Sequence, residues 1–151
     1  MNIKKLLKQY NDLLVEIRDL NKRITKLENK KIGMERDSVK GSNPYFPYQP
    51  RSFTIEGYDY LGADAKESQL RKLNIVLLDR KNKCEVMKVE IEEFISTIPD
   101  SRTRRVFQYR YIDNLSWQAI AMRIGKVHES YPRRDIHDRY LETLEEGLED
   151  K

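Results

Sequence analysis

Residues 3–34, IKKLLKQYNDLLVEIRDLNKRITKLENKKIGM, carry a seam residue at alternating intervals of three and four positions. The members of this seam are Ile3, Leu6, Tyr10, Leu13, Ile17, Leu20, Ile24, Leu27, Lys31 and Met34. Such spacing puts every member on one face of an α-helix and is typical of coiled coils. It predicts a first helix that runs to about Arg36 and needs a partner helix to cover its apolar face.

The same interval returns between residues 70 and 98. Its members are Leu70, Leu73, Leu77, Arg80, Cys84, Met87, Ile91, Phe94 and Ile98. This seam predicts a second long helix, which Pro99 and Asp100 end. Because Cys84 lies on the seam, we expect it to be buried and not reactive, and as the single cysteine it forms no intrachain disulfide. The two helices are expected to pair within the chain as a long antiparallel coiled-coil hairpin across the segment between them.

Between the seams, residues 38–63 lose the periodicity and contain several Gly and Pro residues, which predicts a loop. A short β-hairpin formed by residues 53–56 and 58–60 is the only sheet expected. The segment concentrates aromatic residues at Tyr45, Phe46, Tyr48, Phe53, Tyr58 and Tyr60. Because no basic groove accompanies these rings, we favour a cap on the helical hairpin or a protein contact over stacking on unpaired bases.

The C-terminal third changes from long seams to short helical segments. Ser116 is a candidate N-cap for a short amphipathic helix through Ile124, and Gly125 is expected to end that helix. Trp117 is expected to be a core or interface ring. Residues 130–134 then open another helix. A helix, a tight turn and a second helix are typical of modules that insert the second helix into the major groove of DNA.

Together these patterns predict an all-α protein with two domains. Residues 1–98 form the coiled-coil hairpin with its aromatic loop and serve oligomerisation, and residues 99–151 form a helix-turn-helix DNA-binding domain. A homodimer is expected, since one recognition helix covers only a few base pairs and a second copy adds contacts at high effective concentration.

Positive charge is concentrated in the C-terminal third. Residues 100–141 carry nine Lys or Arg against five Asp or Glu, whereas residues 142–151 carry one Lys against five acids. A local basic segment fits a polyanionic partner such as double-stranded DNA. Candidate contacts at the start of the last helix are Ser130, Tyr131, Arg133, Arg134 and His137. Candidate phosphate contacts elsewhere are Arg102, Arg104, Arg105 and Lys126. Arg133 or Arg134 is expected to read a base, because the guanidinium donor fork matches guanine O6 and N7.

Catalytic and metal-binding patterns are not found in the sequence. There is no Gly-rich phosphate loop, and the acid pairs lie on charged helical surface. His128 and His137 have no cysteine at zinc-ligand spacing. We therefore expect no enzyme, no metal and no cofactor. Met1 leads straight into charged residues without an apolar signal or membrane-spanning run, which predicts a cytoplasmic protein that does not engage a membrane.

Residues 105–111 (RVFQYRY), residues 115–121 (LSWQAIA) and Ile124-Gly125 resemble region 4 of bacterial sigma factors. Between Gly125 and Ile136 the chain is longer than the sigma pattern. Together with the N-terminal seam, the Gly-Ser-Asn-Pro segment and Phe46-Pro47-Tyr48, this ending resembles the RinA/ArpU-type phage transcriptional regulators of Gram-positive hosts. The resemblance implies a sequence-specific regulator that activates phage late genes at the nucleoid of a bacterial host and leaves a contact with RNA polymerase open.

Two other functions remain open at this point. A small terminase-like DNA-packaging protein also joins a helix-turn-helix to oligomerising helices, and a ring of many subunits would favour it. A coiled-coil scaffold or adaptor is the second alternative, in which the C-terminal unit binds protein and its basic residues only solvate a helix face.

Overall fold

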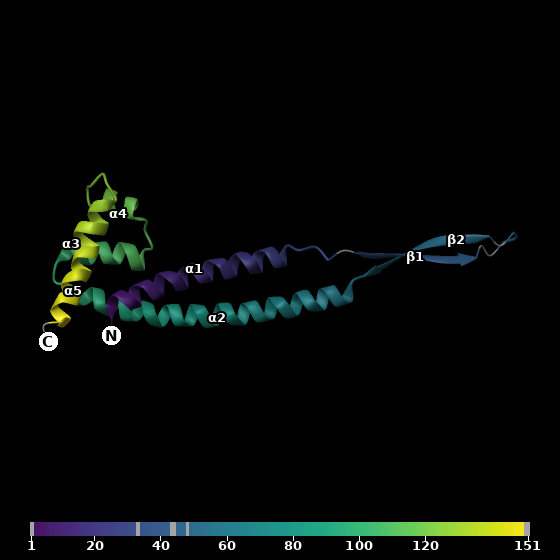
Figure 1. Ribbon diagram of the computed structural model, residues 1–151, viewed down its shortest axis with the longest axis horizontal. Helices are drawn as coiled ribbons and strands as arrows, with labels where there is room; N and C mark the ends of the chain where they lie inside the picture. Colours follow the sequence, from purple (N-terminus) through teal and green to yellow (C-terminus); the bar gives the residue numbers. More distant parts are fainter. Residues whose placement is uncertain (1, 33, 43–44, 48, 150–151) are drawn as a thin grey trace. The chain divides into compact units, whose positions relative to one another are not determined.

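The structure is a computed structural model that describes residues 2–32, 34–42, 45–47 and 49–149. It is mostly helical (Figure 1). The elements in chain order are α1 (Ile3–Glu28), β1 (Met34–Ser42), β2 (Pro50–Tyr58), α2 (Tyr60–Thr97), α3 (Ser101–Phe107), η1 (Gln108–Ile112), α4 (Trp117–Arg123), η2 (Tyr131–Asp138) and α5 (Arg139–Glu149). The chain divides into two compact units, which we call the terminal unit (residues 1–18 and 79–151) and the central unit (residues 19–78).

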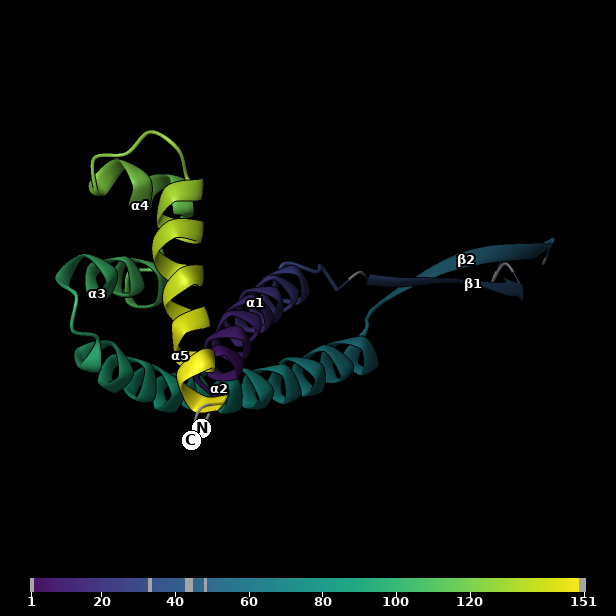
Figure 2. The same ribbon diagram turned by 60° about the vertical axis from the view of Figure 1, so that its left-hand side comes forward.

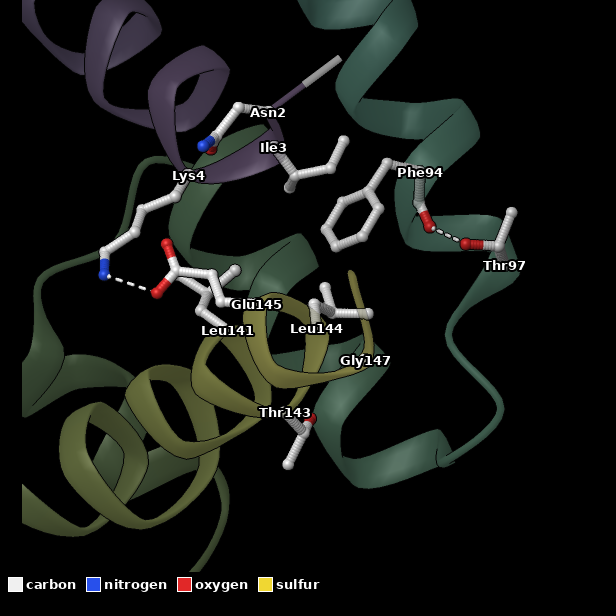
Figure 3. Close-up of a pocket in the computed structure, with 10 residues that line it drawn as sticks. All are labelled: Asn2, Ile3, Lys4, Phe94, Thr97, Leu141, Thr143, Leu144, Glu145 and Gly147. Carbon is white, nitrogen blue, oxygen red and sulfur yellow. Dashed lines mark hydrogen bonds and ion pairs between the residues drawn. The ribbon is translucent and has the colours of Figure 1, made fainter. Parts of the chain in front are cut away.

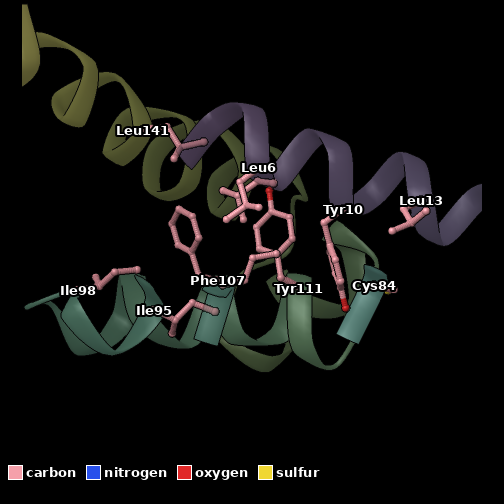
Figure 4. Packing of buried hydrophobic residues seen from close by; sticks show 11 residues of the cluster. Leu6, Tyr10, Leu13, Cys84, Ile95, Ile98, Phe107, Tyr111 and Leu141 are labelled. Atoms are coloured by element: carbon pink, nitrogen blue, oxygen red, sulfur yellow. The ribbon is translucent and has the colours of Figure 1, made fainter. Parts of the chain in front are cut away.

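In the terminal unit, the first half of α1 packs along the last part of α2 through the predicted seams. Figure 4 shows Leu6 and Tyr10 of α1 on the same cluster as Ile95 of α2. Ile91 and Ile98 are 0% exposed, and Cys84 is buried as expected. α5 lies across the start of α1 (Figure 2), where Lys4 Nζ is 3.1 Å from Glu145 Oε2. The burial of seam residues in both helices therefore confirms their predicted core-facing sides.

The cluster of α1 and α2 also takes up residues from the C-terminal third. Phe107, Tyr111 and Leu141 are buried in it. Phe107 is 0% exposed and its ring lies edge-on to Phe94, with the ring centroids 5.8 Å apart. The compact units consequently do not follow the predicted boundary between residues 98 and 99, because large aromatic side chains beyond that boundary pack on the long helices.

In the central unit, α1 ends at Glu28 and not near Arg36. Lys66 Nζ donates to the backbone oxygens of Glu28 and Lys30, at 3.0 and 2.9 Å, and so satisfies two carbonyls at the helix end. Beyond Leu27 the predicted seam continued only through Lys31 and Met34, and a charged residue at a seam position gives little packing energy for another helical turn. The predicted extension of the first helix is wrong for this reason.

The segment between the long helices is an antiparallel β-hairpin. β1 pairs with β2 from Met34 opposite Tyr58 to Ser42 opposite Pro50. The predicted loop over residues 38–63 is therefore wrong, as is the shorter hairpin within residues 53–60, and the fold contains a two-stranded sheet in addition to its helices. Tyr45, Phe46 and Tyr60 are exposed. The remaining predicted aromatic positions, Tyr48 and the side chains of Phe53 and Tyr58, lie outside the described residues, as does the side chain of Met34.

The helix α4 begins and ends where the sequence predicts, and a side chain also caps α3. The side chain of Asp100 accepts from the backbone N–H of Thr103 at 2.7 Å and caps α3. Ser116 Oγ accepts from the backbone N–H of Ala119 at 3.2 Å and caps α4. Gly125 has a φ of +78°, a left-handed conformation that favours glycine, and α4 ends just before it.

No helix in the described ranges has both the length and the apolar character needed to cross a bilayer.

Candidate nucleic-acid interface

The predicted contact helix begins with η2, a π-helical segment that continues directly into α5. Pro132 and Ile136 form its buried side. Arg134 is exposed and Arg133 is half-buried, as are Ser130 and Tyr131. Neither guanidinium makes an ion pair or hydrogen bond with any other part of the chain that the structure describes. The two arginines are therefore held at the start of a packed helix with their charges available to a ligand.

Tyr131 joins residues from three segments. Arg102 of α3 donates from Nη1 to Tyr131 Oη at 3.5 Å, and Lys126 Nζ lies 4.8 Å from the centroid of the Tyr131 ring. We call Arg102, Lys126 and Tyr131 the Tyr131 group. All three were predicted contacts, and the structure brings them together beside the start of η2.

Tyr109 of η1 contacts a second pair of cations, Arg105 and Arg123. Arg105 donates from Nε and Nη2 to Tyr109 Oη, at 3.4 and 3.3 Å, and its Cζ lies 5.7 Å from the ring centroid. Arg123 Cζ lies 5.2 Å from the same centroid. We call Arg105, Arg123 and Tyr109 the Tyr109 group. The sequence analysis missed Arg123, although an exposed cation in the last turn of a short helix before a Gly turn is a signal that could have found it.

Both groups rest on one apolar cluster. Val106, Ile120 and Ile136 are its buried members, and Tyr109 and Tyr131 pack against it. The cluster takes one buried residue from each of α3, α4 and η2. Cations of α3, of α4 and of the turn after α4 consequently contact two tyrosines that share a common support, and these contacts limit the conformations of the long basic side chains.

Arg104, a predicted phosphate contact, has another role in this structure. Its Nε and Nη2 donate to the backbone oxygen of Ile98 at 3.0 and 2.8 Å, and Nη2 also donates to that of Pro99 at 3.3 Å. These are carbonyls at the C-terminal end of α2, where a cation also interacts favourably with the helix dipole. The fold therefore uses Arg104 to cap α2.

The prediction that His137 contacts DNA is not met in this structure, because the residue is only 7% exposed and does not reach the surface. Residues five apart lie on nearly the same side of a π-helix, whose hydrogen bonds join residues i and i+5. His137 follows Pro132 by five positions in η2, so it turns inward with that buried proline. In an ordinary α-helix, His137 would instead lie on the same face as Arg133, four positions before it.

Inside the unit, His137 links η2 to η1. Tyr111 Oη lies 2.8 Å from His137 Nε2, and His137 Nδ1 lies 2.8 Å from Asp138 Oδ1. Burial lowers the pKa of His137, although Asp138 acts in the opposite direction. A neutral ring satisfies both contacts, since Nδ1–H donates to Asp138 and Nε2 accepts the Tyr111 hydroxyl proton. Burial raises the pKa of Tyr111 to about 12, so that hydroxyl keeps its proton at neutral pH.

Trp117 supports the same region from α4. Its ring lies edge-on to His137, with centroids 5.1 Å apart, and Arg110 Cζ lies 4.7 Å from the Trp117 ring centroid. Arg110 also donates from Nη1 to the backbone oxygen of Leu115 at 3.1 Å. The half-buried indole thus has the structural role predicted for it.

Acidic residues limit the basic surface beside Arg102. Asp100 and Asp135 line a pocket with Arg102 and Arg139. Hydrogen bonds from the hydroxyl and the backbone N–H of Thr103 hold the pKa of Asp100 below its usual range, so this carboxylate stays ionised. The side of Arg102 that faces this pocket is therefore less favourable to a phosphate than the side that faces Tyr131.

A separate pocket lies where α1, α2 and α5 meet (Figure 3). Ile3, Phe94 and Leu144 give it apolar walls, and the ion pair of Lys4 with Glu145 lies at its edge. The hydroxyl of Thr97 donates to the backbone oxygen of Phe94 at 2.7 Å. This hydroxyl is therefore not paired with a side chain that could activate it as a nucleophile. Among the described residues, no group of three His, Cys, Asp or Glu side chains is arranged to hold a metal ion.

Comparisons with protein families, with curated proteins and with solved structures find no match to this chain. The start of η2 and the Tyr131 and Tyr109 groups are the features of the chain that bear on its function.

Proposed function

We propose that the chain is a sequence-specific, double-stranded-DNA-binding transcriptional regulator. In this proposal α4, the turn at Gly125 and η2 with α5 form a helix-turn-helix, and the start of η2 enters the major groove. The observation that carries the proposal is the pair Arg133 and Arg134, whose charges are uncompensated while Pro132 and Ile136 fix the opposite side of the same helix. A helix with one packed side and an unpaired basic side suits insertion into a groove of high negative potential.

Base reading is assigned to Arg133 or Arg134, because a guanidinium can bind guanine O6 and N7 together. Phosphate contacts are assigned to the cations of the two tyrosine groups, Arg102 and Lys126 with Arg105 and Arg123. The rings beneath Lys126, Arg105 and Arg123 reduce the entropy lost when these cations bind a phosphate, and the hydroxyl of Tyr131 does the same for Arg102. Ser130, which immediately precedes η2, is a further hydroxyl donor for the backbone of the duplex.

Self-association completes the proposal. α1 and α2 are assigned to a coiled-coil hairpin within a homodimer, so that two helix-turn-helix modules bind successive half-sites. The resemblance to RinA/ArpU-type regulators supports an activator of phage late genes that acts at the nucleoid in the bacterial cytoplasm, with RNA polymerase as a further partner.

Selection of bound fragments from the source genome tests the proposal, followed by binding measurements at several salt concentrations. We expect enrichment of a small number of promoter fragments. The logarithm of the binding constant should fall with the logarithm of salt concentration by about 0.9 for each phosphate contacted. Absence of binding to any duplex at low salt would refute the function, and enrichment of one packaging site by a ring of many subunits would assign the chain to DNA packaging.

A further inference from the structure

A pocket of the terminal unit lies between α1 and residues 113–116, which connect η1 to α4. Its lining residues are Asn11, Leu14, Val15, Arg18, Arg110 and Asn114. All of them belong to the terminal unit. The pocket has a volume of about 320 Å³, and pockets that hold organic ligands start at about 300 Å³. None of its residues is among the proposed DNA contacts, so the pocket is open to a role of its own.

The charge of this pocket is positive and has no counterion within it. Arg18 is exposed and makes no ion pair or hydrogen bond with any other part of the chain that the structure describes. Arg110 is half-buried, and neither of its contacts with described residues is with a carboxylate. Their acidic neighbours in sequence, Asp19 and Asp113, are exposed and are not among the lining residues. Two guanidinium charges are consequently uncompensated in one pocket.

Arg110 is fixed in position without a ligand. Its Nη1 donates to the backbone oxygen of Leu115 at 3.1 Å, and its Cζ lies 4.7 Å from the centroid of the Trp117 ring. These contacts leave the N–H groups of Nε and Nη2 available to an anion. A guanidinium that is already held in one conformation loses little entropy when it binds, which favours affinity.

Asn114 adds an uncharged hydrogen-bonding group to the pocket. Its φ of 53° is left-handed, a conformation that asparagine adopts more readily than most residues. Its side chain makes no hydrogen bond within the described ranges. Asn11 differs, because its amide already has a partner in the hydroxyl of Tyr111. The Asn114 amide is therefore free to bind a ligand beside the two cations.

We infer that this pocket binds a small phosphomonoester whose phosphate contacts both Arg18 and Arg110. A phosphomonoester carries a charge of about −1.5 to −2 at neutral pH, which matches two unpaired guanidinium groups, whereas a single carboxylate compensates only one. The donor fork of arginine also matches the geometry of phosphate oxygens. Leu14 and Val15 supply apolar contact for the organic group. The inference does not depend on DNA binding.

Trp117 fluorescence tests the site, because Trp117 is the single tryptophan of the chain and its ring lies against the Arg110 guanidinium. Phenyl phosphate titrated into the full chain at neutral pH and constant ionic strength should give a saturable change in emission. Phenyl sulfate has nearly the same shape but a single negative charge, so it should bind more weakly. No saturable change with phenyl phosphate, or equal affinity for the two compounds, would overturn the inference.

Arg18→Gln locates the ligand, because it removes one cation and leaves Arg110 and Trp117 in place. It should raise the dissociation constant of phenyl phosphate at least about 10-fold, since a hydrogen bond to a charged group is lost. Arg139→Gln removes an exposed arginine outside the pocket and is the matched control, which should leave the constant unchanged. Circular dichroism checks that both variants fold. Unchanged affinity in Arg18→Gln would overturn the inference.

The DNA backbone is another source of phosphate, and duplex binding tells the two sources apart. Arg18→Gln should leave the salt dependence of duplex binding unchanged. A decrease of about 0.9 in the log–log slope would assign Arg18 to a DNA phosphate and overturn the inference, with the proposed function intact. Weaker binding of phenyl phosphate to Arg123→Gln but not to Arg18→Gln would also overturn it. A chain that binds phenyl phosphate as expected but binds no duplex would refute the proposed function alone.

Discussion

Replacement of His137 by Phe isolates the buried link between η2 and η1. The Phe ring keeps the stacking on Phe107, whose centroid lies 4.8 Å from that of His137, but it removes the acceptor for the Tyr111 hydroxyl. Tyr111 is 3% exposed, so water does not readily replace that acceptor. A buried donor without a partner costs about 1–3 kcal/mol. The free energy of unfolding should fall by that amount at pH 7.

A double-mutant cycle tells this loss apart from poor packing of the new ring. Tyr111→Phe alone leaves His137 Nε2 without a donor and should also cost about 1–3 kcal/mol. The double variant has neither orphan group, so its loss should be smaller than the sum of the single losses by about 1 kcal/mol or more. Additive losses would show that the two side chains do not interact.

The pH dependence provides a second signature of His137. Because its pKa is lowered in the folded protein, the unfolded chain binds the proton first as pH falls below about 6.5. Stability from the neutral ring is therefore complete above about pH 6.5 and declines below it by up to about 1.4 kcal/mol per pH unit, until the folded pKa is reached.

Urea titrations followed by Trp117 fluorescence measure both effects, at pH 7 and at pH 5. The stability difference between the wild type and His137→Phe should shrink as pH falls. An equal difference at the two pH values would refute the assignment of a buried neutral histidine.

Three further substitutions, each with a control substitution, test the cap of α4, the turn and the cations. Ser116→Ala should lower the free energy of unfolding by about 1 kcal/mol, because α4 loses its N-cap, and Ser116→Asp should not; equal losses in urea titrations would refute the cap. Gly125→Ala should destabilise by about 1 kcal/mol because its φ is +78°, whereas Gly147→Ala in α5 should stabilise by up to about 1 kcal/mol. Arg123→Ala should reduce the salt dependence of DNA binding by about 0.9 in the log–log slope, while Arg71→Ala should leave it unchanged; an unaltered slope for Arg123→Ala would remove this residue from the phosphate contacts.

Local sequence signals predicted the buried faces of the two long helices and both ends of α4, although not where α1 ends or where α2 begins. Ile91 and Ile98 lie on a seam whose interval is set by helical geometry alone, and both are fully buried. Ser116 and Gly125 act through backbone groups within three residues, so their roles can be read from the adjacent sequence.

The hairpin was not predictable in the same way. β1 and β2 pair with Val39 opposite Phe53, and the register of a hairpin is set by its turn. The connection between Ser42 and Pro50 is longer than the short turns by which a hairpin is usually predicted from sequence. The helical interval that ran through Lys31 and Met34 was coincidental, because the helix ends at Glu28. The place of Phe107 in the α1 and α2 cluster was also hidden, since a buried aromatic residue does not reveal in sequence which apolar surface it joins.

The candidate site was predicted in part. The basic start of the last helix follows from a helix boundary and a charge pattern, and the exposed Arg134 agrees with that expectation. His137 was misplaced because the sequence gives no sign of π-helical hydrogen bonding in η2. Arg104 was misassigned because its partners, the carbonyls of Ile98 and Pro99, are backbone groups that every sequence contains.

The most direct test of DNA reading by η2 is a pair of affinity measurements. The Arg133→Ala and Arg134→Ala chains are each titrated with a selected genomic duplex and with a scrambled duplex. At least one of the two variants should lose about 1–3 kcal/mol on the selected duplex, or roughly 5- to 150-fold, and much less on the scrambled one. Equal losses of affinity on both duplexes would show that the arginines contact phosphates and do not read bases. Unchanged affinity for the selected duplex in both variants would contradict the assignment of η2 to the major groove.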